Sequence, residues 1–126
     1  MPELVRIRGE QLLGMLEFFE YFHPREAMLI LRGRIEKEVV VVDSLMIPPL
    51  VTHGEGFASF PVHMLPMDLS IVGTAHSHPN GVLSPSTEDL IHFYGAVMAI
   101  AGHPYKSERD VKFFDREGRE VEFELV

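Results

Sequence analysis

The spacing of apolar residues predicts one long helix near the start of the chain. Between Gly9 and Phe22, apolar side chains recur at intervals of three and four, the period of one helix face. This predicted face consists of Leu12, Leu13, Leu16, Phe19 and Phe22. The residue before a proline avoids the helical region, so we expect His23-Pro24 to end the helix.

Most of the remaining chain has the short apolar runs and turn residues that are typical of strands. The runs 27–31 and 39–42 have no polar face, which favours central strands. The predicted strands cover residues 26–34, 37–46, 57–60, 69–75, 96–102, 110–115 and 119–125, with hairpin turns at 33–36 and 116–118.

Two further helical segments are predicted, one over residues 86–95 and a brief turn near 62–67. Loops are expected at 50–55 and 79–85, and Asn80-Gly81 in the second loop is a strong turn signal. A mixed sheet flanked by two helices indicates a three-layer α/β fold. We expect a single domain over residues 1–126, a length that suits one domain.

Composition limits the partners and the compartment. The formal net charge is −8, which argues against nucleic acid because phosphate binding needs clustered Lys and Arg. No apolar run approaches the roughly 20 residues that span a bilayer, and the first residues do not resemble a signal peptide. We therefore expect a cytoplasmic protein without a membrane partner. The chain has no cysteine, so any metal must be held by His and carboxylates.

The segment Gly73–Pro79 contains the pattern His76-Ser77-His78-Pro79 at the end of a predicted strand. Side chains at i and i+2 of a strand point to the same face, so His76 and His78 project together. Asp89 falls in the first turn of the helix that follows. Two histidines and one carboxylate leave the fourth position of a tetrahedral zinc open for water, which indicates a catalytic rather than a structural site.

Each part of this pattern also has a structural interpretation. Ser86-x-x-Asp89 is a helix capping box, with Ser86 as the N-cap. The histidine pair suits polar positions on an edge strand, and Glu26 suits an exposed charge. Other zinc motifs are absent: there is no His-Glu-x-x-His helix, and no Cys for a deaminase site.

The ordered combination resembles the JAMM (MPN+) family of zinc metalloproteases, in its short stand-alone prokaryotic and archaeal form. The family pattern is an upstream Glu, then His-x-His-Pro, six residues, and Ser-x-x-Asp. Here Glu26 precedes His76 and His78, residues 80–85 fill the gap, and Ser86 and Asp89 close the pattern. The resemblance implies the JAMM/MPN fold, which is related to the cytidine-deaminase architecture.

The same resemblance implies a role for each residue. His76, His78 and Asp89 would hold one Zn²⁺ per chain, and the ion would activate a water molecule. Glu26 would accept the proton of that water and pass it to the leaving amine. Ser86 would donate a hydrogen bond to the developing oxyanion.

By resemblance, the reaction is removal of a ubiquitin-like modifier ending in Gly-Gly from lysines of target proteins, as in a deubiquitinase or desampylase. The partners are then the modifier and its conjugates, and loops 50–55 and 79–85 are candidates to line the groove for its tail. A homodimer is compatible with a small apolar-rich domain. Two alternatives stay open: release of an amino acid such as cysteine from a sulfur-carrier protein, and a non-catalytic MPN scaffold. A DNA-linked RadC-like relative is disfavoured by the acidic balance.

Overall fold

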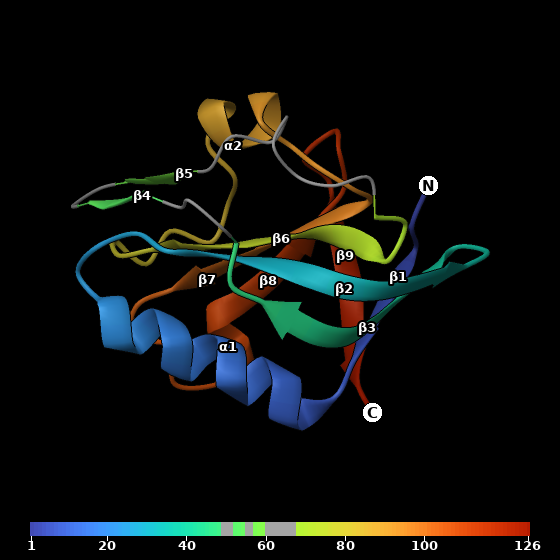
Figure 1. Ribbon diagram of the computed structural model, residues 1–126, viewed down its shortest axis with the longest axis horizontal. Helices are drawn as coiled ribbons and strands as arrows, with labels where there is room; N and C mark the ends of the chain where they lie inside the picture. Colours follow the sequence, from blue (N-terminus) through green and yellow to red (C-terminus); the bar gives the residue numbers. More distant parts are fainter. Residues whose placement is uncertain (49–51, 55–56, 60–67) are drawn as a thin grey trace.

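A computed structural model of the chain describes residues 1–48, 52–54, 57–59 and 68–126 (Figure 1). Helices and strands follow one another in the order β1 (Leu4–Ile7), α1 (Gly9–Phe22), β2 (Met28–Glu36), β3 (Val39–Met46), β4 (Thr52–Gly54), β5 (Phe57–Ser59), β6 (Ile71–His78), α2 (Thr87–Ile91), β7 (Val97–Gly102), η2 (Glu108–Asp110), β8 (Val111–Phe114) and β9 (Glu120–Leu125).

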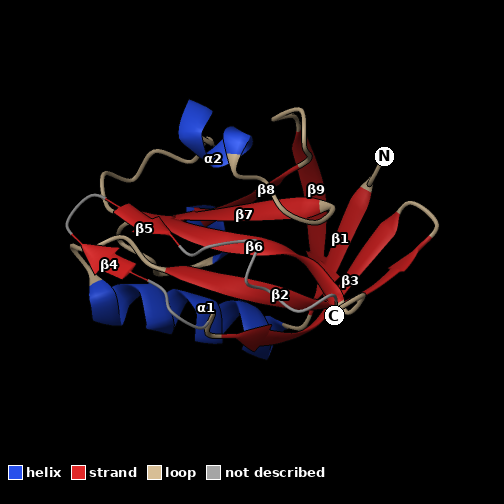
Figure 2. Ribbon diagram, turned by 45° about the horizontal axis from the view of Figure 1, so that its top comes forward, coloured by secondary structure: helices blue, strands red, loops and turns tan. Residues whose placement is uncertain are grey.

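Seven strands form one mixed sheet that closes on itself, in the order β1-β3-β2-β6-β7-β8-β9. β6 lies between β2, to which it is antiparallel, and β7, to which it is parallel. β1 closes the ring because it pairs in parallel with both β3 and β9. The long helix α1 covers one side of the sheet and the short α2 lies on the other (Figures 1 and 2). This confirms the predicted α/β class, although closure by β1 was not predicted.

The largest cluster of buried apolar residues lies between α1 and the sheet. α1 begins and ends at the predicted residues and buries four side chains, those of Leu12, Met15, Leu16 and Phe19. They pack with buried strand residues that include Val5, Ile7, Leu29, Leu31, Val40 and Val42. The predicted apolar face was wrong in one member, because the side chain of Leu13 is 54% exposed, and it omitted Met15.

The hairpin between β2 and β3 turns later than predicted. Strand pairing continues to Glu36 opposite Val39, so the turn lies at residues 37–38 and not at 33–36. Lys37 takes the left-handed conformation, with φ of 60°. Gly33, whose residue type indicated a turn, lies inside β2 at a register shift, where a Cβ would sit 1.8 Å from the carbonyl oxygen of Val41. Because Gly33 has no side chain, β2 and β3 can approach each other closely at this point.

The second predicted helix is also shorter than expected. α2 ends at Ile91, and Gly95 has a φ of 86°, which is outside the right-handed helical region. The brief helical turn predicted at 62–67 lies outside the described residues. Within the described part of the chain, no helix has the length and apolar character that crossing a membrane requires.

Candidate metal centre

β6 carries both candidate histidine ligands on one side of the sheet. The strand runs to His78, so the two histidines lie inside it and not beyond the predicted end at residue 75. His76 is opposite Met28 of β2 and Ile100 of β7, and His78 is opposite Gly102. Ser77, between them, faces the other way and is buried. Pairing with both neighbouring strands at His76, and with β7 at His78, fixes the direction in which the two imidazoles project.

The N-terminus of α2 brings Asp89 and Ser86 to this end of β6. Ser86 is the N-cap: its Oγ accepts a hydrogen bond from the Asp89 amide at 3.0 Å, and its own amide donates to Asp89 Oδ2 at 2.8 Å. The predicted capping box is therefore present. It does not use the proton of the Ser86 hydroxyl, which remains available for donation to another group.

His78 and Asp89 face each other directly. His78 Nε2 lies 3.0 Å from Asp89 Oδ2, and His78 Nδ1 lies 3.0 Å from the carbonyl oxygen of Val82. Because a carbonyl only accepts, Nδ1 carries a proton, and Nε2 is the nitrogen directed at the carboxylate. A metal ligand histidine is usually oriented through its second nitrogen in this way.

This contact shifts both ionisation equilibria. Burial lowers the pKa of His78, but the hydrogen bond and charge of Asp89 more than offset it, so the pKa lies above its ordinary value. Burial raises the pKa of Asp89, but the hydrogen bonds from His78 and from the Ser86 amide outweigh it and bring the pKa to about 2. Asp89 is therefore a carboxylate at any physiological pH.

His76 differs from His78 in its partner and its charge. Its Nε2 lies 3.0 Å from the hydroxyl oxygen of Thr74, which is buried on the same face of β6. Burial lowers the pKa of His76 to about 4; the charge of Asp89 opposes this change, and His78 adds to it. His76 is therefore neutral at pH 7, as a metal ligand must be.

Glu26 lies near His78, next to the end of the pairing between β2 and β6. Met28 is opposite His76, and the Ser77 amide donates to the Ala27 carbonyl at 3.0 Å, so Glu26 directly precedes the last residue of its segment that is bonded to β6. The negative charge of Glu26 helps to raise the pKa of His78. Glu26 is partly buried and lies two residues before β2 begins, so the strand predicted from residue 26 starts later.

The donor set fits zinc. Two imidazoles and one carboxylate are the ligand types of catalytic zinc sites. His78 Nε2 and Asp89 Oδ2 are 3.0 Å apart, near the roughly 3.3 Å that separates two ligands on tetrahedral zinc with bonds of about 2.0–2.1 Å. Among the described residues, no three potential ligands converge on one point, and His76 Nε2 contacts Thr74 instead of the His78–Asp89 pair.

Three residues of this region were not singled out from the sequence. Val82 orients His78, Thr74 contacts His76, and Ser77 joins β6 to the segment after Glu26. The positions of Thr74 and Ser77 could have been inferred from the sequence. The two-residue period of a strand places Thr74 on the same face as His76 and Ser77 on the opposite face. The Val82 contact depends on loop geometry that sequence spacing does not give.

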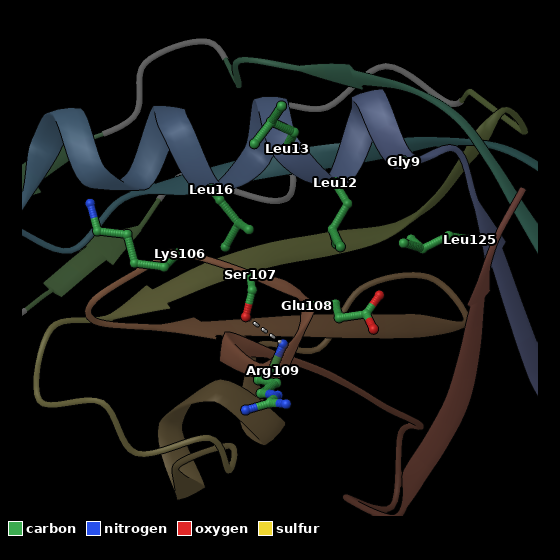
Figure 3. Close-up of a pocket in the computed structure, with 9 residues that line it drawn as sticks. All are labelled: Gly9, Leu12, Leu13, Leu16, Lys106, Ser107, Glu108, Arg109 and Leu125. Carbon is green, nitrogen blue, oxygen red and sulfur yellow. Dashed lines mark hydrogen bonds between the residues drawn. The ribbon is translucent and has the colours of Figure 1, made fainter.

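A separate pocket of about 490 Å³ lies on the other side of the sheet (Figure 3). It runs between α1 and residues 106–109, with Leu12, Leu13, Leu16 and Leu125 among its lining side chains. None of the candidate site residues lines it. It is therefore not part of the candidate metal centre.

Comparison with known proteins identifies the family to which this fold belongs. A family model described as prokaryotic homologues of the JAB domain matches residues 13–117. A probable metalloprotease of Haloferax volcanii is 37% identical over 132 residues, covering 98% of this chain and 81% of the relative.

Solved structures give the same picture. A JAB1/MPN domain protein from Archaeoglobus fulgidus is 34% identical, with a TM-score of 0.68 and coverage of 100% of this chain and 99% of that one. A structure that describes JAMM as a metalloprotease-like zinc site in the proteasome and signalosome is 31% identical, with a TM-score of 0.71 and coverage of 98% of both chains.

Fold, donor set and relatives together define a JAMM-type, metalloprotease-like domain. The chain belongs to the family of prokaryotic homologues of the JAB domain.

Proposed function

We propose that the protein is a zinc-dependent isopeptidase that removes a ubiquitin-like modifier, ending in Gly-Gly, from lysine side chains of target proteins. The observation that carries the proposal is the contact of His78 with Asp89, beside a helix N-cap serine and within reach of the charge of Glu26. Metal ligands, a carboxylate base and a hydroxyl donor on adjoining segments are the groups that amide hydrolysis needs.

His76, His78 and Asp89 would hold one Zn²⁺ per chain. When bound, zinc supplies a Lewis acid that activates water and polarises the scissile carbonyl. Asp89 contributes a permanent negative charge, and His76 contributes a neutral imidazole at pH 7. The Val82 carbonyl holds the His78 ring in the orientation that presents Nε2 to the metal.

Glu26 serves as the general base and then as the general acid. It accepts a proton from the attacking water and returns it to the lysine amine as the C–N bond breaks, so protons balance over the cycle. Two observations support this role: Glu26 directly precedes the last residue of its segment that is bonded to β6, and its charge acts on the His78 ring.

Ser86 donates a hydrogen bond to the substrate carbonyl oxygen as negative charge develops there. Its oxygen is held by the Asp89 amide, which fixes the hydroxyl near the metal ligand while leaving its proton available. Capping and catalysis therefore use different parts of one hydroxyl group.

Family membership and the segment next to His78 support the proposed substrate class. Residues 79–85 form an ordered loop in which the Val82 amide donates to Asn80 Oδ1 at 3.0 Å, and the side chain of Val82 is half exposed. An extended tail without side chains suits recognition by main-chain hydrogen bonds beside such a loop. The other candidate loop, 50–55, was predicted incorrectly at residues 52–54, which form β4; residues 50, 51 and 55 lie outside the described residues.

The test uses zinc-loaded protein and a host ubiquitin-like modifier joined through Gly-Gly to a target lysine. Free modifier is measured by mass spectrometry. We expect release by the wild type and a loss of about 10²- to 10⁴-fold in Glu26→Gln, because a general base is removed. Glu17→Gln, an exposed change on α1, is the matched control and should keep full activity.

Two results would contradict the proposal. One is equal release by Glu26→Gln and the wild type. The other is no release by a folded wild type with zinc bound. A parallel sample, in which the same modifier carries a C-terminal cysteine after Gly-Gly, then distinguishes a sulfur-carrier hydrolase from a scaffold.

A further inference from the structure

Ser77 makes three hydrogen bonds to Ala27, the residue that follows Glu26. Its Oγ accepts from the Ala27 amide at 2.8 Å and donates to the Ala27 carbonyl at 3.4 Å. Its own amide also donates to the Ala27 carbonyl, at 3.0 Å. Both residues are buried, with Ser77 only 1% exposed. A buried backbone amide requires a hydrogen-bond acceptor. For the Ala27 amide, this acceptor is the Ser77 hydroxyl and not a backbone carbonyl of the neighbouring strand.

These bonds occur where the regular pairing of β2 with β6 ends. The last ladder pair is Met28 with His76, and β2 begins at Met28. Ser77 extends the pairing by one residue, to Ala27, and so fixes the backbone next to Glu26. The segment that carries the two histidines is thereby joined to the segment that carries the carboxylate.

We propose that Ser77 is a positioning residue, which holds Glu26 at the reactive centre through the Ala27 amide. This inference rests on the proposed function and deepens it. The side chain of Ser77 points away from His76 and His78, so it contributes to the placement of Glu26 and not to the ligand set.

Loss of the Ser77 hydroxyl has a specific expected effect. In Ser77→Ala the Ala27 amide loses its acceptor, and Glu26 loses one constraint on its position. A misplacement of about 1 Å at a reacting group can cost roughly 10²-fold, so we expect kcat to fall about 10- to 100-fold. KM and zinc affinity should each stay within about threefold, because the groups that bind substrate and metal are not changed.

The experiment compares four zinc-loaded proteins in the modifier-release assay: wild type, Ser77→Ala, Glu26→Gln and the double variant. If Ser77 acts through Glu26, its removal lowers the rate in the wild-type background and has no further effect in Glu26→Gln. Ser77→Thr keeps the hydroxyl and should restore most of the activity. Ser70→Ala removes a hydrogen-bonded hydroxyl seven residues earlier in the chain and should leave kcat unchanged.

A second measurement does not depend on activity. Hydrogen exchange of the Ala27 amide, followed by NMR in wild-type and variant chains, should be about tenfold faster in Ser77→Ala and close to wild type in Ser77→Thr. This readout also serves as the test if a variant binds substrate poorly.

Distinct failures separate this inference from the proposed function. An active wild type with fully active Ser77→Ala, or with equal losses in both Glu26 backgrounds, would overturn the positioning role alone. Unchanged exchange at Ala27 would do the same. An inactive, zinc-loaded wild type would overturn the proposed function, and the positioning role with it.

Discussion

At the scale of single residues, His76 makes the metal-free protein sensitive to acid. Its pKa of about 4 in the folded chain lies below the ordinary value of 6.5. Between these values the unfolded chain binds the proton and the folded chain does not, so stability falls as the pH decreases from about 6.5 to 4. Each unit of pKa difference corresponds to about 1.4 kcal/mol, so the loss of unfolding free energy over this range approaches about 3 kcal/mol. Solvent contact at the exposed edge of the imidazole ring makes the loss smaller.

Urea unfolding of the chelator-treated protein across this pH range measures the effect. His76→Gln should flatten the pH dependence, whereas His92→Gln, an exposed histidine after α2, should retain it. His78 does not interfere, because its raised pKa adds stability that is complete below pH 6.5 and is lost only at higher pH. Equal slopes in His76→Gln and the wild type would contradict the assignment.

At the scale of elements, Gly102 allows the loop after β6 to pack against β7. A Cβ at this position would lie 2.9 Å from Leu83 and 3.0 Å from the Gly81 carbonyl oxygen. In Gly102→Ala the loop must shift, and with it the Val82 carbonyl that orients His78. We expect a loss of about 1–3 kcal/mol in unfolding free energy and about 10- to 100-fold weaker zinc binding.

Urea unfolding and competitive zinc titration measure the two effects. Gly14→Ala is the matched control, because a Cβ at Gly14 of α1 meets nothing within 4 Å. That change should leave zinc binding unaltered and stabilise the helix by up to about 1 kcal/mol. If Gly102→Ala bound zinc as tightly as the wild type, the loop would not control the His78 ring.

At the scale of the whole molecule, the stability of the closed sheet depends on β1, the four-residue strand that joins β3 to β9. Ile7 is 0% exposed and is paired with Val42 on one side and Leu125 on the other. Ile7→Ala should cost about 2–5 kcal/mol in unfolding free energy, because it leaves a cavity between three elements. Ile35→Ala, at a position that is 55% exposed, should cost less than about 1 kcal/mol in the same urea titration. Similar losses for both variants would exclude a closing role for β1.

Local pattern predicted much of the fold, and its failures have physical causes. The helix at 9–22 has the correct ends because apolar periodicity and Pro24 agree. β1 was missed because four residues carry too little pattern, and its strand state depends on pairing with distant segments. Gly33 was predicted to form a turn because glycine is common in turns. Glycine also allows two strands to approach closely, and at Gly33 the close contact with Val41 is the reason for the residue.

The candidate site was also predicted only in part from the sequence. The order of Glu, His-x-His and Ser-x-x-Asp along the chain was enough to select the residues that the fold brings to one end of β6. Spacing alone did not indicate that Glu26 would lie near enough for its charge to act on His78, or that the hydroxyl of Thr74 would meet His76. Those relations depend on strand register and rotamers, which arise from the whole sheet. The roles of the five residues remain predictions.

The parallel pairing of β1 with β9 has a consequence for the synthesis of the chain. β1 is made before β9, so the ring cannot close on a nascent chain until residue 125 has emerged. Until then β1 and β8 present open edges that other chains can pair with. The interval between translation of β1 and translation of β9 is therefore a period in which these edges need protection from neighbouring chains.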